Sequence, residues 1–302
     1  MKTGVMLCGH GSRDGEAIVE FEALAAGLRA RLPELPVATG YLEFARPMIR
    51  DGLAVLRERG ATRILAVPGM LFAASHVKND LPWEINSFAA ANPALELRFG
   101  RELAIEPKLL TAAAERIETA ERQAARQISR ADTLLMVVGR GTNDPDANSN
   151  IAKLARMLWE GMGFGWAETC YSGVASPLVE PALMRVRRLG FPRIIVFPYF
   201  LFTGVLVKRI YAAADRVAAD ASVEIVKAPY LNDHRLVIDC FADRVDELET
   251  AEPAMNCRLC KFRTQIIGYA DEAGAPQAAH HHHVRGIGTG DEPHHHHHRP
   301  HR

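Results

Sequence analysis

The sequence has no apolar run long enough to cross a membrane and no excess of charge of either sign. No segment approaches the roughly 18 apolar residues of a membrane span, and residues 1–4 lead directly into a strand-like run without the pattern of a signal peptide. The 36 lysines and arginines balance the 36 aspartates and glutamates, which argues against binding to nucleic acid or a polyanionic surface. We therefore expect a cytoplasmic protein whose partners include neither nucleic acid nor a membrane.

Cysteine is also scarce, with five residues in a chain of 302. Cys8, Cys170 and Cys240 are scattered, whereas Cys257 and Cys260 form a C-x-x-C pair, and this usage favours reduced thiols over a disulfide framework. We expect the three scattered cysteines to be buried as small apolar side chains. The sequence contains no G-x-x-x-x-G-K-[ST] loop, so it gives no sign of nucleotide-driven chemistry.

Short β-rich runs alternate with helical stretches along most of the chain. Runs that are apolar throughout, such as TLLMVV and RIIVFP, are typical of parallel strands covered on both faces. The alternation predicts a doubly wound parallel-sheet α/β fold. The expected strands are residues 3–8, 36–42, 63–67, 95–99, 133–138, 167–172, 193–197 and 222–226, and the expected helices are residues 15–32, 48–59, 77–91, 106–129, 147–161, 178–189, 207–220 and 233–249.

The chain also contains an internal repeat that needs no gap. A shift of 130 residues pairs Arg63-Ile64 with Arg193-Ile194 and Val77-Lys78 with Val207-Lys208. The same shift pairs Gly9 with Gly139, Gly11 with Gly141, Asp14 with Asp144, Tyr41 with Tyr171, Pro47 with Pro177 and Pro68 with Pro198.

The repeat divides the chain into three parts. We predict two tandem α/β domains, residues 1–125 and 126–250, connected by the helix near 106–129, with a cleft between them where a ligand binds. Residues 251–302 contain proline, glycine and histidine runs with little apolar periodicity, which predicts a flexible tail.

Three polar side chains that follow strands in the first repeat are lost in the second. Because ligands bind at the carboxyl ends of strands in open α/β sheets, these positions are candidates for a site. From the first repeat to the second, the changes are His10 to Arg140, Glu43 to Gly173 and His76 to Leu206.

Two imidazoles and one carboxylate at one sheet edge are typical ligands of a divalent first-row metal. Each residue also has a simpler explanation: the Gly-x-Gly around His10 is typical of a phosphate-binding turn, His76 can cap the following helix, and Glu43 can be solvated. The joint loss of all three in the second repeat favours the metal site, with residues 1–125 carrying the active site.

These motifs resemble a known family. GHGSRD after the first strand, YLEFARP after the second and AVPGMLFAASHVKNDLP after the third resemble the sirohydrochlorin chelatases, which are ATP-independent, class II tetrapyrrole metal chelatases. The resemblance covers residues 1 to about 250. The segment MNCRLC and the histidine tracts that follow it resemble the long, cobalt-inserting form of cobalamin synthesis.

The resemblance implies both an activity and its residues. The family places two active-site histidines at positions that match His10 and His76, and an acidic residue at a position that matches Glu43. It implies that this chain inserts Co²⁺, as substrate metal, into sirohydrochlorin, with Fe²⁺ insertion for sirohaem as the alternative. The histidines are the expected metal ligands, and Glu43 or a histidine is the expected proton acceptor.

Sirohydrochlorin carries carboxylates, so basic side chains near the strand ends are candidates to bind it. A solvated surface charge is the alternative for each of them. The candidates are Arg13, Arg46, Lys78, Arg140 and Lys208.

The tail carries further metal-binding residue types. In the resembling family the M-x-C-x-x-C segment is associated with an iron–sulfur centre, which makes Cys257 and Cys260 candidate ligands of a [4Fe–4S] cluster. Two thiolates do not complete a four-cysteine site, so the cluster needs further ligands from a second chain, from Cys8, Cys170 or Cys240, or from side chains other than cysteine. A second chain that supplies them would make a homodimer. The histidine tracts, which are His280–His283, His294–His298 and His301, are expected to bind cobalt or nickel, with an expression tag as the alternative.

Two other classes of protein fit part of the pattern. A metal-storage protein or metallochaperone would hold ions through the same histidines without turnover. A two-lobed binding protein would use only the cleft for a small molecule.

Overall fold

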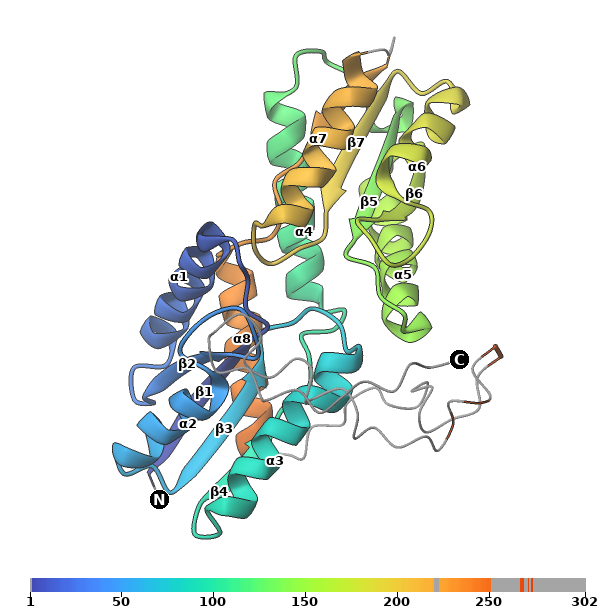
Figure 1. Ribbon diagram of the computed structural model, residues 1–302. Helices are drawn as coiled ribbons and strands as arrows, with labels where there is room; N and C mark the ends of the chain where they lie inside the picture. The colour runs from blue at the N-terminus through green and yellow to red at the C-terminus, as the bar shows by residue number, and fades with distance from the viewer. Residues whose placement is uncertain (1, 220–222, 251–266, 269–270, 272, 274–302) are drawn as a thin grey trace.

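The fold consists of two α/β lobes, one built mostly from each half of the chain (Figure 1). The computed structural model describes residues 2–219, 223–250, 267–268, 271 and 273. The first half contains β1 (Thr3–Gly9), α1 (Gly15–Arg31), β2 (Val37–Tyr41), α2 (Ile49–Glu58), β3 (Arg63–Pro68), the π-helical turn η1 (His76–Asp80), α3 (Leu81–Ala91), β4 (Glu96–Phe99) and α4 (Pro107–Gln123). The second contains η2 (Arg130–Asp132), β5 (Thr133–Gly139), α5 (Pro145–Met162), β6 (Trp166–Tyr171), α6 (Val179–Val186), η3 (Arg187–Leu189), β7 (Arg193–Pro198), α7 (Val205–Ala219), β8 (Glu224–Lys227) and α8 (Arg235–Thr250).

Each lobe contains a four-stranded sheet in which every pairing is parallel. The strand order is β2-β1-β3-β4 in the first sheet and β6-β5-β7-β8 in the second. The register repeats as well, because Thr3 pairs with Arg63 and Thr133 pairs with Arg193. The predicted doubly wound α/β fold with an internal duplication is therefore confirmed.

The last helix of each half packs on the other half. Helix α4 contacts β7, β8 and α5, while α8 contacts α1 and β3. Arg116 of α4 donates a hydrogen bond to the carbonyl of Leu231, and the guanidinium groups of Arg63 and Arg98 donate to the carbonyl of Leu248 in α8. Each lobe therefore includes one helix from the other half of the sequence: α4 packs in the second lobe and α8 packs in the first.

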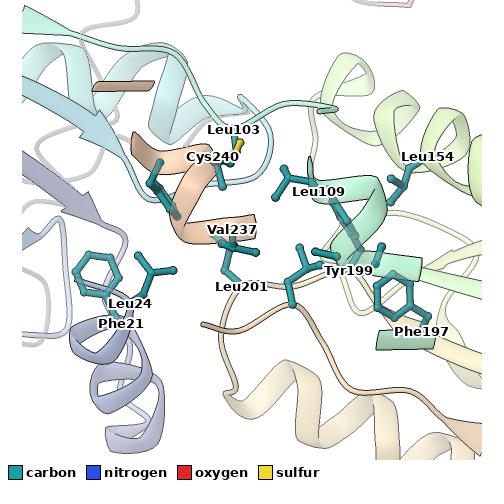
Figure 2. Packing of buried hydrophobic residues seen from close by; sticks show 14 of the residues in the cluster. Phe21, Leu24, Leu103, Leu109, Leu154, Phe197, Tyr199, Leu201, Val237 and Cys240 are labelled. Atoms are coloured by element: carbon teal, nitrogen blue, oxygen red, sulfur yellow. The ribbon is translucent and has the colours of Figure 1, made fainter. Parts of the chain in front are cut away.

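This exchange produces one continuous core between the two sheets. The inner faces of both sheets share a single hydrophobic cluster that includes α1, α4, α5 and α8. Figure 2 shows Leu109 of α4 between Val237 and Cys240 of α8 and the aromatic rings of Phe197 and Tyr199. The outer face of each sheet has a separate core. Burial of apolar surface on both faces explains why the central strands are apolar throughout.

Most predicted element boundaries differ from the observed ones by one or two residues, and two differences, at the end of one helix and at the start of another, bear on the fold. The helix predicted over 106–129 ends at Gln123, because the chain beyond it is held along the second sheet: Arg193 donates to the carbonyl oxygens of Arg126 and Ile128. The helix predicted over 77–91 begins one residue earlier as the π-helical turn η1 before it continues as α3.

The three scattered cysteines are buried free thiols, as predicted from their spacing. Burial raises the pKa of Cys170 and of Cys240 to about 12, and it raises the pKa of Cys8 further, so all three thiols are protonated at neutral pH. None of the helices in the described ranges is both long and apolar enough to span a membrane. The predicted flexible tail, including Cys257 and Cys260, lies almost entirely outside the described residues.

Candidate active site

The loop after β1 contacts the loop after β2 because the residue at their crossing is glycine. Gly11 has a φ of 96°, and a Cβ atom there would lie 1.7 Å from the carbonyl oxygen of Glu43. No other residue type fits this approach without displacing backbone. The backbone N–H of Glu43 donates to the carbonyl of His10 at 3.0 Å, so the contact brings these two residues together.

The third residue, His76, begins the π-helical turn η1 that follows β3. Its Nε2 lies 3.1 Å from Nε2 of His10, which in turn lies 3.2 Å from Oε1 of Glu43. The three potential ligand atoms all lie within 4.8 Å of one another. The structure thus places the three predicted donors in one cluster at the carboxyl edge of the first sheet.

The hydrogen bonds on the far side of each ring define which nitrogen has a free lone pair. Nδ1 of His76 lies 2.7 Å from Oδ2 of Asp80, and Nδ1 of His10 lies 3.0 Å from the carbonyl of Gly11. Both partners only accept, so both Nδ1 atoms carry a proton in the neutral rings. The two Nε2 atoms therefore face each other with lone pairs, an arrangement that a cation between them stabilises.

The distances suit a first-row metal ion. Metal–nitrogen bonds of about 2.1 Å to two atoms that lie 3.1 Å apart enclose an angle of about 95°, which is close to the cis angle of octahedral coordination. The cluster can therefore supply two nitrogen ligands and one oxygen ligand on the same side of an ion.

Burial shifts the pKa values of His10 and Glu43, two members of the cluster, and so changes their protonation near neutral pH. Burial, followed by the charge of His76, lowers the pKa of His10 to about 4, so this imidazole is neutral and able to bind a metal at pH 7. Burial raises the pKa of Glu43 to about 7, against the opposing effects of His76 and Arg140. Glu43 can therefore both release and accept a proton near neutral pH.

Asp80 is a site residue that the sequence analysis missed. It is almost fully buried, holds Nδ1 of His76 and accepts a hydrogen bond from Asn79 at 3.0 Å. The 130-residue shift places Ile210 opposite Asp80, so the comparison that singled out His76 would also have identified this carboxylate.

The arginine candidates remain near the strand ends. Arg140 follows β5 in the second lobe and is exposed, yet its charge acts on both His10 and Glu43. Arg13 is exposed and lies over the ring of Phe44, with its guanidinium carbon 4.7 Å from the ring centre. Arg46 is exposed in the loop after β2. All three stay candidates for binding substrate carboxylates.

The two lysine candidates instead form ion pairs between the lobes. Nζ of Lys78 lies 2.8 Å from Asp144 and 3.0 Å from Asp146, and its side chain is only 1% exposed. Burial lowers the pKa of Lys78, but the hydrogen bonds to the two aspartates outweigh this effect and raise it. Nζ of Lys208 lies 2.9 Å from Oδ2 of Asp14 across the same interface. The ammonium group of Lys78 is thus committed to the protein rather than open to a ligand.

The second lobe has no equivalent cluster among the described residues. Arg140, Gly173 and Leu206 stand where the first lobe has His10, Glu43 and His76. The backbone is nevertheless retained: Gly141 has a φ of 82°, and a Cβ atom on it would lie 1.9 Å from the carbonyl of Gly173. The second lobe therefore has the same loop backbone without the donors.

Comparison with known proteins agrees with this duplicated architecture. The sequence model of the CbiX family matches residues 4–120 and 134–248. A sirohydrochlorin cobaltochelatase of Priestia megaterium is 31% identical over 268 residues, which cover 88% of this chain and 87% of the relative. A sirohydrochlorin ferrochelatase of the same organism is 30% identical over 226 residues, which cover 74% of this chain and 82% of the relative.

A solved structure shows the same fold. SirB from Bacillus subtilis with Fe³⁺ superposes with a TM-score of 0.74 at 26% identity, covering 83% of this chain and 96% of SirB. The duplicated parallel sheets, the match to both halves and the relative that spans most of the chain together show that this protein belongs to the CbiX family of class II chelatases.

Proposed function

We propose that this protein inserts Co²⁺ into sirohydrochlorin without nucleotide hydrolysis, as a step of cobalamin biosynthesis. The observation that carries the proposal is the cluster of His10, Glu43 and His76, whose three ligand atoms lie within 4.8 Å of one another in the first lobe. The names of the two Priestia megaterium relatives support sirohydrochlorin as the macrocycle.

The residues of the cluster have the properties that metal insertion needs. The imidazoles of His10 and His76 hold the ion through nitrogen ligands that pyrrole nitrogens can replace. Insertion of a divalent ion releases two pyrrole protons; Glu43, with a pKa of about 7, accepts one of them, and the other passes to water. Arg140 and Arg13 face the same edge and bind carboxylates at the periphery of the macrocycle.

The choice of Co²⁺ over Fe²⁺ as the inserted metal rests on two observations. The cobaltochelatase relative covers more of this chain than the ferrochelatase does, and the M-x-C-x-x-C tail resembles the cobalt-inserting long form. The ferrochelatase relative, and the presence of Fe³⁺ in the SirB structure, support Fe²⁺ as the second candidate.

We also propose that Cys257 and Cys260 bind a [4Fe–4S] cluster together with cysteines of a second chain. The three remaining cysteines are buried in the core and protonated, so they do not fit as cluster ligands within one chain. Anaerobic reconstitution, followed by measurement of iron per chain and of molecular mass, tests this; a cluster held by a monomer would contradict the dimer.

Turnover distinguishes insertion from metal storage. Reduced protein is mixed with excess sirohydrochlorin and either Co²⁺ or Fe²⁺, and the change in tetrapyrrole absorbance is followed with time. We expect many macrocycles to be converted per chain, faster with Co²⁺, whereas a metallochaperone would release its ions without accelerating insertion.

Matched substitutions in the two lobes test the site. His10→Ala and His76→Ala are expected to slow insertion at least about 100-fold, because each removes a ligand of the ion. Leu206→Ala, at the position equivalent to His76 in the second lobe, is expected to stay within about twofold of wild type. Near-normal rates in both histidine variants would rule out the proposed site.

A further inference from the structure

The interface between the lobes contains the same ion-pair arrangement twice. Nζ of Lys78 binds Asp144 at 2.8 Å and Asp146 at 3.0 Å, and Nζ of Lys208 binds Asp14 at 2.9 Å and Glu16 at 2.8 Å. The 130-residue shift maps the members of one arrangement onto those of the other. Such reciprocal contacts are typical of a two-fold interface.

The two arrangements differ in their exposure to solvent. The side chains of Lys78, Asp144 and Asp146 are 1%, 3% and 6% exposed, whereas those of Lys208 and Glu16 are 51% and 70% exposed. Exposed pairs contribute little because water screens them. In a buried network, removal of one partner leaves an uncompensated charge, so the geometry of the network is strongly enforced.

The buried network is attached to the segment that carries a metal donor. Lys78 lies inside the turn η1 (His76–Asp80), two residues after His76 and two before Asp80. Asp80 in turn holds Nδ1 of His76 at 2.7 Å. This short turn thus contains a donor, the carboxylate that orients it and the lysine that anchors it to α5.

The corresponding segment of the second lobe shows what is specific to the first. There the lysine, Lys208, is retained, but Leu206 and Ile210 replace His76 and Asp80. The segment is regular α-helix in α7 (Val205–Ala219), rather than a π-helical turn. The π-helical turn and the buried network occur together in the lobe with the donors, and π-helical turns are frequent at functional sites.

We infer that Lys78, held by Asp144 and Asp146 of the second lobe, is a positioning residue that places His76 for metal binding. The lobe without donors therefore supports the site of the other lobe through this contact. The inference rests on the proposed function only in taking His76 as a metal ligand.

Metal affinity tests the inference without requiring turnover. The full chain is titrated with Co²⁺, and its visible absorption is recorded. The same titration is carried out on each protein with the added substitution His10→Ala. The difference between the two titrations is the His10-dependent binding, without the contribution of other sites such as the tail histidines. Asp146→Asn is compared with Glu16→Gln, which removes the equivalent charge from the exposed arrangement. We expect Asp146→Asn to weaken the His10-dependent binding about tenfold, and Glu16→Gln to change it less than about twofold.

Two further measurements separate positioning from a general loss of stability. In steady-state insertion, Asp146→Asn is expected to raise the KM for Co²⁺ and leave the KM for sirohydrochlorin unchanged. If Asp146→Asn does not fold, the double variant Lys78→Gln with Asp146→Asn replaces it, because this variant keeps the net charge of the network. It is expected to show the same weaker Co²⁺ binding, since glutamine is shorter than lysine and does not bridge to Asp144.

The outcomes are distinct. Wild-type Co²⁺ affinity in Asp146→Asn, or equal losses in Asp146→Asn and Glu16→Gln, would overturn the inference. His10-dependent Co²⁺ binding by a wild-type protein that inserts neither Co²⁺ nor Fe²⁺ would contradict the proposed function alone, and the comparison of affinities would still test the role of Lys78.

Discussion

At the scale of single residues, the position of a few protons determines what the site can bind. Asp80 and the carbonyl of Gly11 each hold a Nδ1 proton, which leaves the Nε2 lone pairs of His10 and His76 facing each other at 3.1 Å. Oε1 of Glu43 adds a third acceptor 3.2 Å from His10. Acceptors this close repel one another unless a proton or a metal ion lies between them.

The raised pKa of Glu43 makes metal binding depend on pH. Protonation of Glu43 below its pKa of about 7 removes one anionic ligand, whereas His10, with a pKa of about 4, stays neutral from pH 8 to pH 6. The His10-dependent Co²⁺ affinity should therefore fall as the pH is lowered through 7, by up to about tenfold per pH unit. Titration of Glu43→Gln should show a flatter profile; an equally steep one would assign the titration to another group.

Gly11 provides a second test at this scale. Gly11→Ala adds a Cβ atom where the carbonyl of Glu43 lies 1.7 Å away at a φ of 96°, and it should destabilise the protein by well over about 1 kcal/mol and weaken Co²⁺ binding. Gly141→Ala meets the same obstacle at Gly173 and should also destabilise the protein, but it should weaken the His10-dependent binding less than Gly11→Ala does, because it reaches the site only through the loop that leads to Asp144 and Asp146. Urea unfolding and Co²⁺ titration of both variants measure this; equal effects on binding would show that the Glu43 loop is not needed.

At the scale of elements, the turn η1 (His76–Asp80) converts a strand end into a ligand-bearing segment. His76 and Asp80 lie four residues apart on this turn, so the carboxylate of Asp80 reaches Nδ1 of His76. Outer carboxylates of this kind fix the ring orientation of a metal-binding histidine and increase its basicity.

Loss of the Asp80 carboxylate should therefore weaken the site without removing a ligand. We expect Asp80→Asn to lower Co²⁺ affinity about 10- to 100-fold and to slow insertion correspondingly. Asp243→Asn, which removes a partly exposed carboxylate paired with Lys108, is the control and should leave both unchanged. Full affinity in Asp80→Asn would mean that the hydrogen bond to His76 has no part in metal binding.

At the scale of the whole molecule, the exchanged helices make the two lobes depend on each other. Helix α4 (Pro107–Gln123) completes the core of the second lobe and α8 (Arg235–Thr250) completes that of the first. Arg244 of α8 is buried and donates to the carbonyls of Glu102 and Leu103, which adds polar contacts to the exchange.

Separate halves should not fold as independent monomers. A fragment of residues 1–125 lacks α8 and leaves the apolar face of α4 without its partner, so we expect it to be poorly folded or to associate by exchanging α4. Mixing it with residues 126–250 should restore a one-to-one complex. Circular dichroism and molecular mass in solution measure this, and a fragment that unfolds cooperatively as a monomer would contradict the expectation.

Local sequence patterns were enough to predict much of this protein. The apolar strands, the parallel α/β architecture and the duplication follow from periodicity and from a repeat that needs no gap, because strands buried on both faces must be apolar. The same comparison of repeats singled out His10, Glu43 and His76, since the carboxyl ends of neighbouring parallel strands meet at one edge.

Other features were decided only by the tertiary structure. Whether Lys78 meets a ligand or a protein carboxylate depends on how the lobes approach, and the sequence alone placed it among the substrate-binding candidates although it is buried against Asp144 and Asp146. The exchange of α4 and α8 could not be predicted from the sequence either. The amphipathic pattern of a helix indicates that one face packs on an apolar surface, but it does not indicate which of two similar sheets provides that surface.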